Sequence, residues 1–347
     1  MNFAIVGAGA IAGLRKAAID QLSGSALTGV FDMVAERATQ LAGDALTYGA
    51  FEELVGDSRV DTVVLCTPPD THADMAIAAL KAGKHVIVEK PMASTVADCK
   101  RMIAAANKAK RVLTVGFNHR YFPAIKEMRN SIASGRLGNI SHVRGYSGHT
   151  GLSEFKAEWM YSKDVMGGGA MLDNGIHMID LVHHLMGPVR DVYGLTQDKT
   201  WGLDRVEDNG MALLRGADGV IGSVGASWTE WKGYQFYVEV YGDRGMARAY
   251  YAPMYFMEVT MDRPGGDRRK RRNFYLPQIF AEKFRGWQST AVQTLVEEMQ
   301  DFIALTQNDA AQGTIASAAD GLRAIEIAQA VYSASDTGKP VKLAPMK

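Results

Sequence analysis

The fold of this chain is decided by its first stretch, residues 2–13, which read NFAIVGAGAIAG. An apolar run of strand length is followed at once by the pattern G-x-G-x-x-A, which opens a helical pattern. Gly7 permits a tight turn, Gly9 lets the backbone approach a ligand, and the small Ala12 lets helix and strand pack closely. The free N–H groups at the start of such a helix attract a diphosphate. The stretch therefore predicts a dinucleotide-binding turn, although glycine-rich turns of this kind also occur for packing reasons alone.

An acidic residue stands at the distance that such a unit requires. Asp32 ends the second apolar run, 19 positions after Gly13. A carboxylate there accepts hydrogen bonds from the adenosine ribose and repels a 2′-phosphate, which predicts NAD rather than NADP as the cofactor. The nearby Arg37 is the one feature that favours NADP, and Asp32 can also cap the next helix. The predicted cofactor contacts in this region are Gly7, Gly9, Ala10, Ile11, Asp32 and Arg37.

The first third of the chain alternates between two hydrophobic periods. Short apolar runs predict strands at 2–6, 27–31, 62–66, 85–88 and 112–115, and helical patterns lie between them at 10–22, 34–42, 72–82 and 95–109. Thr95 and Asp98 form a capping box, and Gly83 stops the helix before it. Continuous apolar strands that alternate with helices predict a parallel sheet covered on both faces.

The pattern changes near Phe117–Pro123, and we place the domain boundary there, giving domains 1–118 and 119–347. Turn residues at Ala217–Gly219 and Gly242–Gly245 predict hairpins. Strand-like runs lie at 140–150, 189–199, 208–216, 218–229, 234–242, 245–251 and 255–262, and helical patterns return at 289–306 and 314–334. The predicted fold class is α/β followed by α+β, with a mainly antiparallel second sheet.

Composition agrees with a two-domain enzyme. The chain has 347 residues, 47% apolar and 22% charged, which excludes a disordered or fibrous protein. Its 38 Lys and Arg balance 38 Asp and Glu, so no net charge favours nucleic acid or a membrane as partner. Cys66 and Cys99 are too few for a disulfide framework. With no secretory pattern at the start and no membrane-length apolar run, we expect a cytoplasmic protein.

Two further loops follow predicted strands. Residues 66–72 read CTPPDTH and residues 85–91 read HVIVEKP. Ligands of open α/β sheets bind at the carboxyl ends of the strands, where both loops lie. We therefore expect Lys90, held in a stiff turn by the following proline, to face the cofactor. An exposed ion pair of Glu89 with Lys90 is the alternative. The predicted cofactor contacts here are Thr67, Pro68, His72, Glu89 and Lys90.

A third loop, residues 167–177, reads GGGAMLDNGIH and leads into a helix that runs to about Met186. Asp173 and His177 are four positions apart, so one helix face would present both side chains. The glycines let the backbone pass close to a ligand or move as a lid.

Together these strings resemble the Gfo/Idh/MocA oxidoreductase family over nearly the whole chain. The resemblance implies a Rossmann domain followed by an open-faced sheet that forms a homodimer or homotetramer. It also implies an activity on the secondary hydroxyl groups of sugars, cyclitols or sugar nucleotides. The family's catalytic residues would map onto Lys90, Asp173 and His177. One position departs from the pattern: many relatives have arginine after the tryptophan at Trp159, where this chain has Met160.

The resulting hypothesis is hydride transfer between NAD and a carbohydrate or polyol. His177 would act as the base, since imidazole titrates near ~6.5, while Lys90 would bind the reacting oxygen. Asp173 would accept a substrate hydroxyl or orient the pair. A purely structural helix histidine is the alternative for His177. The predicted substrate contacts are Lys90, Arg120, Tyr121, His149, Trp159, Asp173 and His177, with lesser candidates in His119, Trp228, Trp231 and Trp287.

Other interpretations carry less support from the residues. A metal site at His177, His183 and His184 lacks any known ligand spacing, so we expect no metal. The basic run 268–272 follows Pro264-Gly265-Gly266 and is interpreted as a solvated hairpin or loop. Alternative functions are an NAD-dependent glycosidase, a sugar-nucleotide 3-dehydrogenase and a dinucleotide sensor without catalytic activity.

Overall fold

The structure is a computed structural model that describes residues 1–153, 157–307 and 314–345. Its backbone forms two compact units. Unit 1 comprises Met1–Tyr121 and Ala281–Leu322, and unit 2 comprises Phe122–Phe280 and Arg323–Lys347. The first boundary lies three residues beyond the predicted one. The predicted second domain, 119–347, differs from the structure because 281–322 returns to unit 1.

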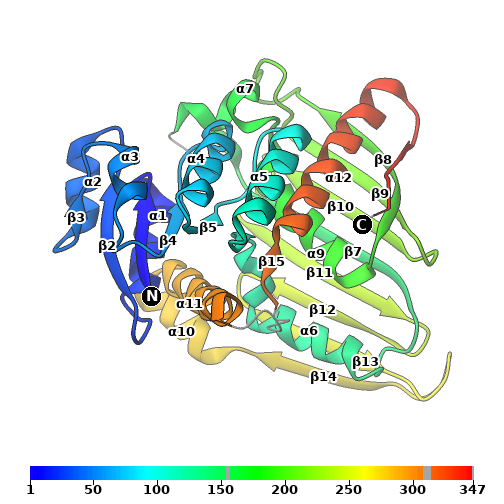
Figure 1. The fold of residues 1–347 in the computed structure, drawn as a ribbon. Coiled ribbons are helices and arrows are strands. Elements are labelled where there is room, and N and C mark those ends of the chain that lie inside the picture. Colours follow the sequence, from blue (N-terminus) through cyan, green and yellow to red (C-terminus); the bar gives the residue numbers. More distant parts are fainter. Residues whose placement is uncertain (154–156, 308–313, 346–347) are drawn as a thin grey trace. The chain divides into compact units, whose positions relative to one another are not determined.

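Unit 1 contains a parallel sheet with the strand order expected of a Rossmann domain, and one short antiparallel strand at its edge (Figure 1). The order is β15-β6-β5-β4-β1-β2-β3. The strands are β1 (Asn2–Val6), β2 (Ala26–Phe31), β3 (Leu46–Thr47), β4 (Thr62–Leu65), β5 (His85–Val88), β6 (Leu113–Val115) and β15 (Ala316–Ser317). The carboxyl ends of β1 and β4 meet where the chain order reverses, which is the ligand-binding position of such sheets.

The helices of unit 1 are α1 (Ala10–Ile19), α2 (Ala35–Ala42), α3 (Phe51–Gly56), α4 (Pro69–Lys81), α5 (Val96–Ala109), η1 (Asn118–Tyr121) and α11 (Gln288–Gln307). The ends of the predicted helices of this unit lie within three residues of the predicted ranges, and α3 has no predicted counterpart. Thr95 accepts the backbone N–H of Asp98 at 3.1 Å, which confirms the predicted cap of α5. Helix α4 starts three residues before the predicted position because Pro69 suits the first turn of a helix.

Unit 2 contains a nine-stranded mixed sheet in the order β14-β13-β12-β11-β7-β10-β9-β8-β16. Only the β7–β10 pair is parallel among the described strands of this sheet. The strands are β7 (Ile140–Gly148), β8 (Val189–Gln197), β9 (Asn209–Gly216), β10 (Ile221–Ser227), β11 (Gln235–Gly242), β12 (Gly245–Tyr251), β13 (Tyr255–Thr260), β14 (Arg269–Phe274) and β16 (Val341–Lys342). Both predicted hairpin turns are present, between β9 and β10 and between β11 and β12.

One face of this sheet is covered and the other is open. Helix α9 (Gly175–Met186) lies against β7 and β10 (Figure 1), where a Cβ on Gly145 would come within 2.7 Å of Val182. The other helices of unit 2 are α6 (Pro123–Ala133), η2 (Gly151–Ser153), η3 (Glu158–Tyr161), α7 (Lys163–Met166) and α8 (Ala170–Asp173), while α10 (Leu276–Arg285) and α12 (Ala318–Thr337) each belong partly to both units. On the uncovered face, Leu195 and Met211 are cross-strand neighbours, 58% and 67% exposed.

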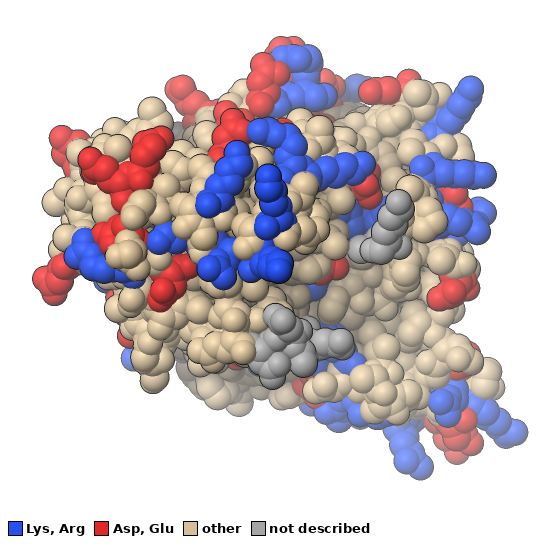
Figure 2. Space-filling view, in the orientation of Figure 1, with Lys and Arg blue, Asp and Glu red and all other residues tan. Residues whose placement is uncertain are grey.

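The basic run 268–272 lies mostly on the exposed second strand of a hairpin, which agrees with the hairpin alternative of the sequence interpretation and not with the loop. Strand β14 pairs antiparallel with β13, and its six side chains are exposed. Charged side chains are a common protection of edge strands against pairing with other chains. On the face drawn in Figure 2, Lys and Arg are interspersed with Asp and Glu. Among the described residues, no helix combines the length and apolarity needed to cross a bilayer.

Helix α11 belongs to unit 1 because its apolar face and one charge are buried there. Leu295, Met299 and Phe302 join the core cluster built on β1 and α1. Beside them the Arg15 guanidinium, which is fully buried, lies 2.6 Å from Glu89 and 2.5 Å from Glu298. Burial raises the pKa of Glu298 to about 7; Arg15 opposes this shift and the negative charge of Glu89 adds to it.

The Glu298 carboxyl predicts a pH dependence of stability. Its pKa in the folded chain lies above its ordinary value of 4.5, so the folded state holds the proton longer than the unfolded state. Its contribution is complete below that ordinary value and is lost as the pH rises through about 7. Glutamine resembles the protonated carboxyl, so we expect the melting temperature of Glu298→Gln, measured relative to the wild type, to rise between about pH 5 and pH 8. Glu297→Gln, on the same helix, is the control, and parallel melting curves for Glu298→Gln and wild type would refute the shift.

Candidate active site

The turn after β1 has the geometry of a diphosphate cradle. Gly7 has φ +88°, and a Cβ there would lie 2.9 Å from the carbonyl carbon and oxygen of Cys66. Gly9 is the N-cap of α1, no described side chain caps that helix, and no described atom lies within 4 Å of the position of a Cβ on Gly9. The backbone N–H groups at Ala10 and Ile11 therefore begin a helix whose positive end faces open space. These residues fit the diphosphate of a dinucleotide.

Asp32 binds backbone N–H groups on both sides of the end of β2; Val34 and not Asp32 is the N-cap of α2, and the contact of Asp32 with the ribose stays a prediction. Its Oδ2 accepts the backbone N–H of Ala8 at 2.6 Å, and its Oδ1 accepts that of Val34 at 2.8 Å. The carboxylate therefore ties the glycine turn to the start of α2 and stays at the end of β2, where the ribose of a dinucleotide is bound in such domains. Arg37 lies exposed on the first turn of α2.

His72 braces the two loops that follow β4 and β5. Its ring is buried, Nε2 lies 2.8 Å from the Thr67 carbonyl oxygen, and Nδ1 lies 3.1 Å from that of Pro91. Burial lowers the pKa of His72, although the carbonyl oxygens oppose that shift. Both ring nitrogens thus face backbone, which gives His72 a positioning role for these loops, and its predicted contact with the cofactor stays a prediction.

The residue before Lys90, Glu89, also has a partner within unit 1. Glu89 is buried and pairs with Arg15 from α1, which excludes the alternative of an exposed Glu89–Lys90 pair; the predicted contact of Glu89 with the cofactor stays a prediction. Lys90 itself is partly exposed at the carboxyl end of β5. Desolvation and the positive charge of Lys90 lower the pKa of His119 to about 3, so His119 is neutral over the physiological range. His119, a lesser candidate from sequence, is thus close enough to Lys90 to be affected by its charge.

In unit 2, Asp173 is the centre of a buried hydrogen-bond network. Its Oδ2 accepts the indole N–H of Trp228 at 3.1 Å and lies 3.0 Å from His149 Nε2. The other ring nitrogen of His149 accepts the backbone N–H of Gly151 at 3.0 Å, so Nε2 carries the proton and donates to Asp173. His149 therefore holds the carboxylate in place, and its predicted contact with the substrate stays a prediction.

Asp173 and His177 lie on consecutive helices and not on one continuous helix. Helix α8 ends at Asp173, and α9 begins at Gly175, with Asn174 between them in helical conformation. Gly175 has no room for a side chain, since a Cβ would lie 2.7 Å from that of Ala226. His177 follows on the first turn of α9 and is 7% exposed. The predicted single helix carrying both residues is therefore wrong, because a break at Asn174 separates α8 from α9.

A clamp that the motifs did not reveal holds the glycine-rich loop. Glu207 accepts the backbone N–H of Gly169 at 2.8 Å and of Met171 at 2.9 Å, and the Tyr332 hydroxyl donates to it at 2.9 Å. Burial raises the pKa of Glu207, and these donors oppose that shift. A Cβ on Gly168 would lie 2.0 Å from the Tyr332 oxygen, so the loop fits only as glycine. The only local sign of this clamp in the sequence is the acidic pair Glu207-Asp208, which stands directly before a strand.

The remaining substrate candidates divide by exposure. Arg120 and Tyr121 are buried in unit 1; Arg120 lies 3.6 Å from Asp320, and the Tyr121 hydroxyl donates to Asp301 at 2.7 Å. Both side chains thus have partners within unit 1, and their predicted substrate contacts stay predictions. Trp159 is 38% exposed on η3 and stays a candidate. Among the described residues, no group of three His, Cys, Asp or Glu is arranged to hold a metal ion.

The fold and the cradle define an NAD-binding oxidoreductase of the Rossmann type. Residues 1–117 match the model described as the oxidoreductase family with an NAD-binding Rossmann fold, and residues 125–248 match the GFO/IDH/MocA C-terminal domain. The chain belongs to this Gfo/Idh/MocA family.

Two relatives and one solved structure illustrate the similarity. The chain is 32% identical to inositol 2-dehydrogenase of Salmonella typhimurium over 70% of this chain and 72% of that protein. It is 26% identical to myo-inositol 2-dehydrogenase of Thermotoga maritima over 99% of this chain and 98% of that protein. The structure of levoglucosan dehydrogenase in complex with NADH superposes with a TM-score of 0.85 at 23% identity, covering 99% of each chain, and shares the fold.

The Glu207 clamp predicts an effect on catalysis that is separate from cofactor binding. All three groups around its carboxylate donate, so Glu207→Gln places an amide N–H against a donor and loses one hydrogen bond. We expect a free energy of unfolding lower by about 1–3 kcal/mol and a reduced kcat, with the NAD dissociation constant unchanged.

Tyr332→Phe is the milder comparison because it removes one donor and leaves the carboxylate in place. Circular dichroism melts, steady-state kinetics and NAD fluorescence quenching measure the three quantities. A wild-type kcat in Glu207→Gln would contradict the claim that Glu207 positions the glycine-rich loop for catalysis.

Proposed function

We propose that this protein catalyses NAD-dependent oxidation or reduction at a secondary hydroxyl or keto carbon of a sugar, cyclitol or related polyol. The observation that carries the proposal is the anchored Asp173, one turn before His177, in a chain whose Lys90 follows β5 of an NAD-binding domain. The names of the relatives, inositol and levoglucosan dehydrogenases, support the substrate class.

Several residues of this chain would hold the cofactor. The turn 7–13 and the start of α1 take the diphosphate, while the Asp32 carboxylate takes the ribose and disfavours NADP. Thr67 and Pro68 form the adjoining edge after β4, braced from behind by His72. Bound NAD supplies the acceptor for the hydride that leaves the carbinol carbon.

The hydroxyl proton of the substrate is transferred by side chains of this protein. His177 accepts the hydroxyl proton as the alcohol becomes a ketone, and returns it in the reverse direction. The Lys90 ammonium donates a hydrogen bond to the same oxygen and stabilises its developing negative charge. Asp173, fixed by Trp228 and His149, binds a neighbouring substrate hydroxyl or orients the imidazole.

The open face of the unit 2 sheet supports an assembly of two or more copies. Besides Leu195 and Met211, the neighbouring pair Tyr193 and Leu213 is 38% and 58% exposed, which extends the apolar patch across two strands. Patches of this kind commonly mark protein interfaces. We infer a homo-oligomer through this face. Sedimentation velocity should show a dimer or tetramer that Met211→Arg dissociates, and a wild-type monomer at micromolar concentration would contradict it.

We also propose that the enzyme acts in carbohydrate metabolism in the cytoplasm, because its proposed substrates are sugars, cyclitols or polyols and its two cysteines, Cys66 and Cys99, are free. The metabolic role follows from the proposed reaction, and it falls if the reaction does.

The catalytic assignment is tested by single substitutions with a substrate panel of inositols, sugars and aryl glycosides. Lys90→Ala and His177→Ala should each lower kcat by about 100-fold or more while the fold and NAD binding persist. Absorbance at 340 nm measures turnover with NAD and with NADP. The matched control is His184→Ala, a histidine farther along the same helix.

Two outcomes would contradict the proposal. Near wild-type kcat in both variants would remove Lys90 and His177 from the chemistry. Release of an aglycone without net NADH would establish the glycosidase alternative.

A further inference from the structure

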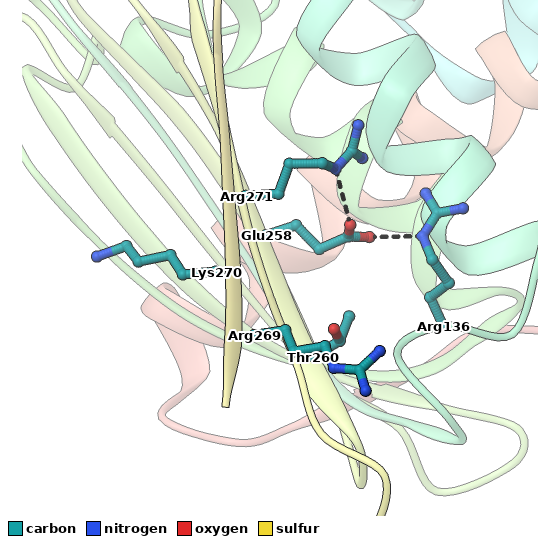
Figure 3. A pocket seen from close by; sticks show the side chains of 6 residues that line it. All are labelled: Arg136, Glu258, Thr260, Arg269, Lys270 and Arg271. Carbon is teal, nitrogen blue, oxygen red and sulfur yellow. Dashed lines mark hydrogen bonds and ion pairs between the residues drawn. The ribbon is translucent and has the colours of Figure 1, made fainter. Parts of the chain in front are cut away.

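An arginine-lined pocket lies in unit 2, on residues that the proposed reaction does not use. It has a volume of about 360 Å³ and is lined by Arg136, Glu258, Thr260, Arg269, Lys270 and Arg271 (Figure 3). Arg136 comes from the segment after α6, and the other residues come from the edge strand β14 and its neighbour β13.

The strand register brings the charges to one face. Glu258 is paired with Arg271 across the two strands, and Thr260 with Arg269. Because side chains alternate along a strand, these four lie on the same face, and the Lys270 side chain extends to the other face (Figure 3). The pocket therefore collects three guanidinium groups, since Arg136 approaches from the side of α6.

The one carboxylate in the pocket is fully engaged. Glu258 is 4% exposed; its Oε1 accepts Arg136 Nε at 2.9 Å and its Oε2 accepts Arg271 Nε at 3.2 Å. Outside the pocket lining, Glu127 pairs with Arg271 and Ser131 accepts from Arg136 at 3.0 Å. Each oxygen of Glu258 thus holds one guanidinium group, that of Arg136 or that of Arg271.

Arg269 is left with its charge uncompensated. Its guanidinium forms no hydrogen bond or ion pair with any residue that the structure describes, and it lies on the Thr260 side of the pocket (Figure 3). Counting Arg136, Arg269 and Arg271 against Glu258 and Glu127 leaves a net charge of +1. The groups that face the free space are donors: guanidinium N–H groups and the Thr260 hydroxyl.

We propose that this pocket binds the phosphate group of a small molecule, with Arg269 as the main ligand and Thr260 and the outer N–H groups of Arg136 and Arg271 completing the site. Guanidinium forks match the geometry of phosphate oxygens, and an oxyanion of about −1.5 to −2 charges is opposite in sign to the local excess. The volume exceeds that of a lone phosphate and admits a sugar phosphate. The site is independent of the proposed hydride transfer.

The test is calorimetric titration of the NAD-saturated full-length protein with inorganic phosphate at low ionic strength. Saturation with NAD fills the diphosphate cradle at α1, so the remaining binding reports other sites. We expect one equivalent of phosphate to bind, and Arg269→Gln to weaken it by about tenfold. Arg272→Gln is the matched control, since it removes the same guanidinium charge from the opposite face of the same strand and does not line the pocket, and it should change the affinity by less than about twofold.

Three results would overturn the proposal: no phosphate binding by the wild type, unchanged binding by Arg269→Gln, or equal weakening by both variants. Equal weakening would mean that phosphate responds only to general surface charge. Glucose 6-phosphate forms the second arm of the experiment. A sugar phosphate that binds more tightly than inorganic phosphate identifies a phosphorylated small molecule as the occupant, and weaker binding of the ester than of the free ion would contradict that part of the proposal.

Discussion

The buried ion pair between Arg15 and Glu89 is the interaction on which the cofactor-binding unit depends. Arg15 is on α1, whose first turn forms the diphosphate cradle, and Glu89 precedes Lys90 at the end of β5. A buried charge is costly unless a partner of opposite charge holds it, so the loss of Arg15 would leave Glu89 without this cation, and the loss of Glu89 would leave Glu298 to hold Arg15. The pair therefore fixes the cradle and the Lys90 loop relative to each other within unit 1. Gly116 makes room for it, because a Cβ there would lie 2.6 Å from Arg15.

In unit 2, buried carboxylates are held by neutral hydrogen-bond donors and not by a cation. Asp173 is buried, but an indole and an imidazole N–H satisfy one of its oxygens. Glu207 is buried beneath the glycine-rich loop and takes three donors. In both cases a carboxylate is kept in a fixed place by hydrogen bonds that cannot be exchanged for water. Fixed polar groups of this kind are what a proton-transfer site requires, since the geometry is set before the substrate arrives.

Much of this was predictable from the sequence because the signals were local. The strand period, the glycine turn and the Thr95 cap gave the first sheet, and the hairpin turns gave the second. The motifs also identified Lys90, Asp173 and His177 as candidates. Long-range partners were not predictable: nothing near Glu298 in the chain indicates Arg15, 283 positions away. For the same reason the return of α11 to unit 1, the burial of Arg120 and Tyr121, and the Glu207 clamp emerge only from the three-dimensional packing.

The central claim is that Lys90 of unit 1 and His177 of unit 2 act on the same substrate oxygen. A crystal structure of the ternary complex with NAD and a bound polyol tests it most directly. The account predicts that Lys90 Nζ and one His177 ring nitrogen each lie within about 3.2 Å of the oxygen on the carbon that faces the nicotinamide. A complex in which either group is more than about 6 Å from that oxygen, with no bridging water, would contradict it.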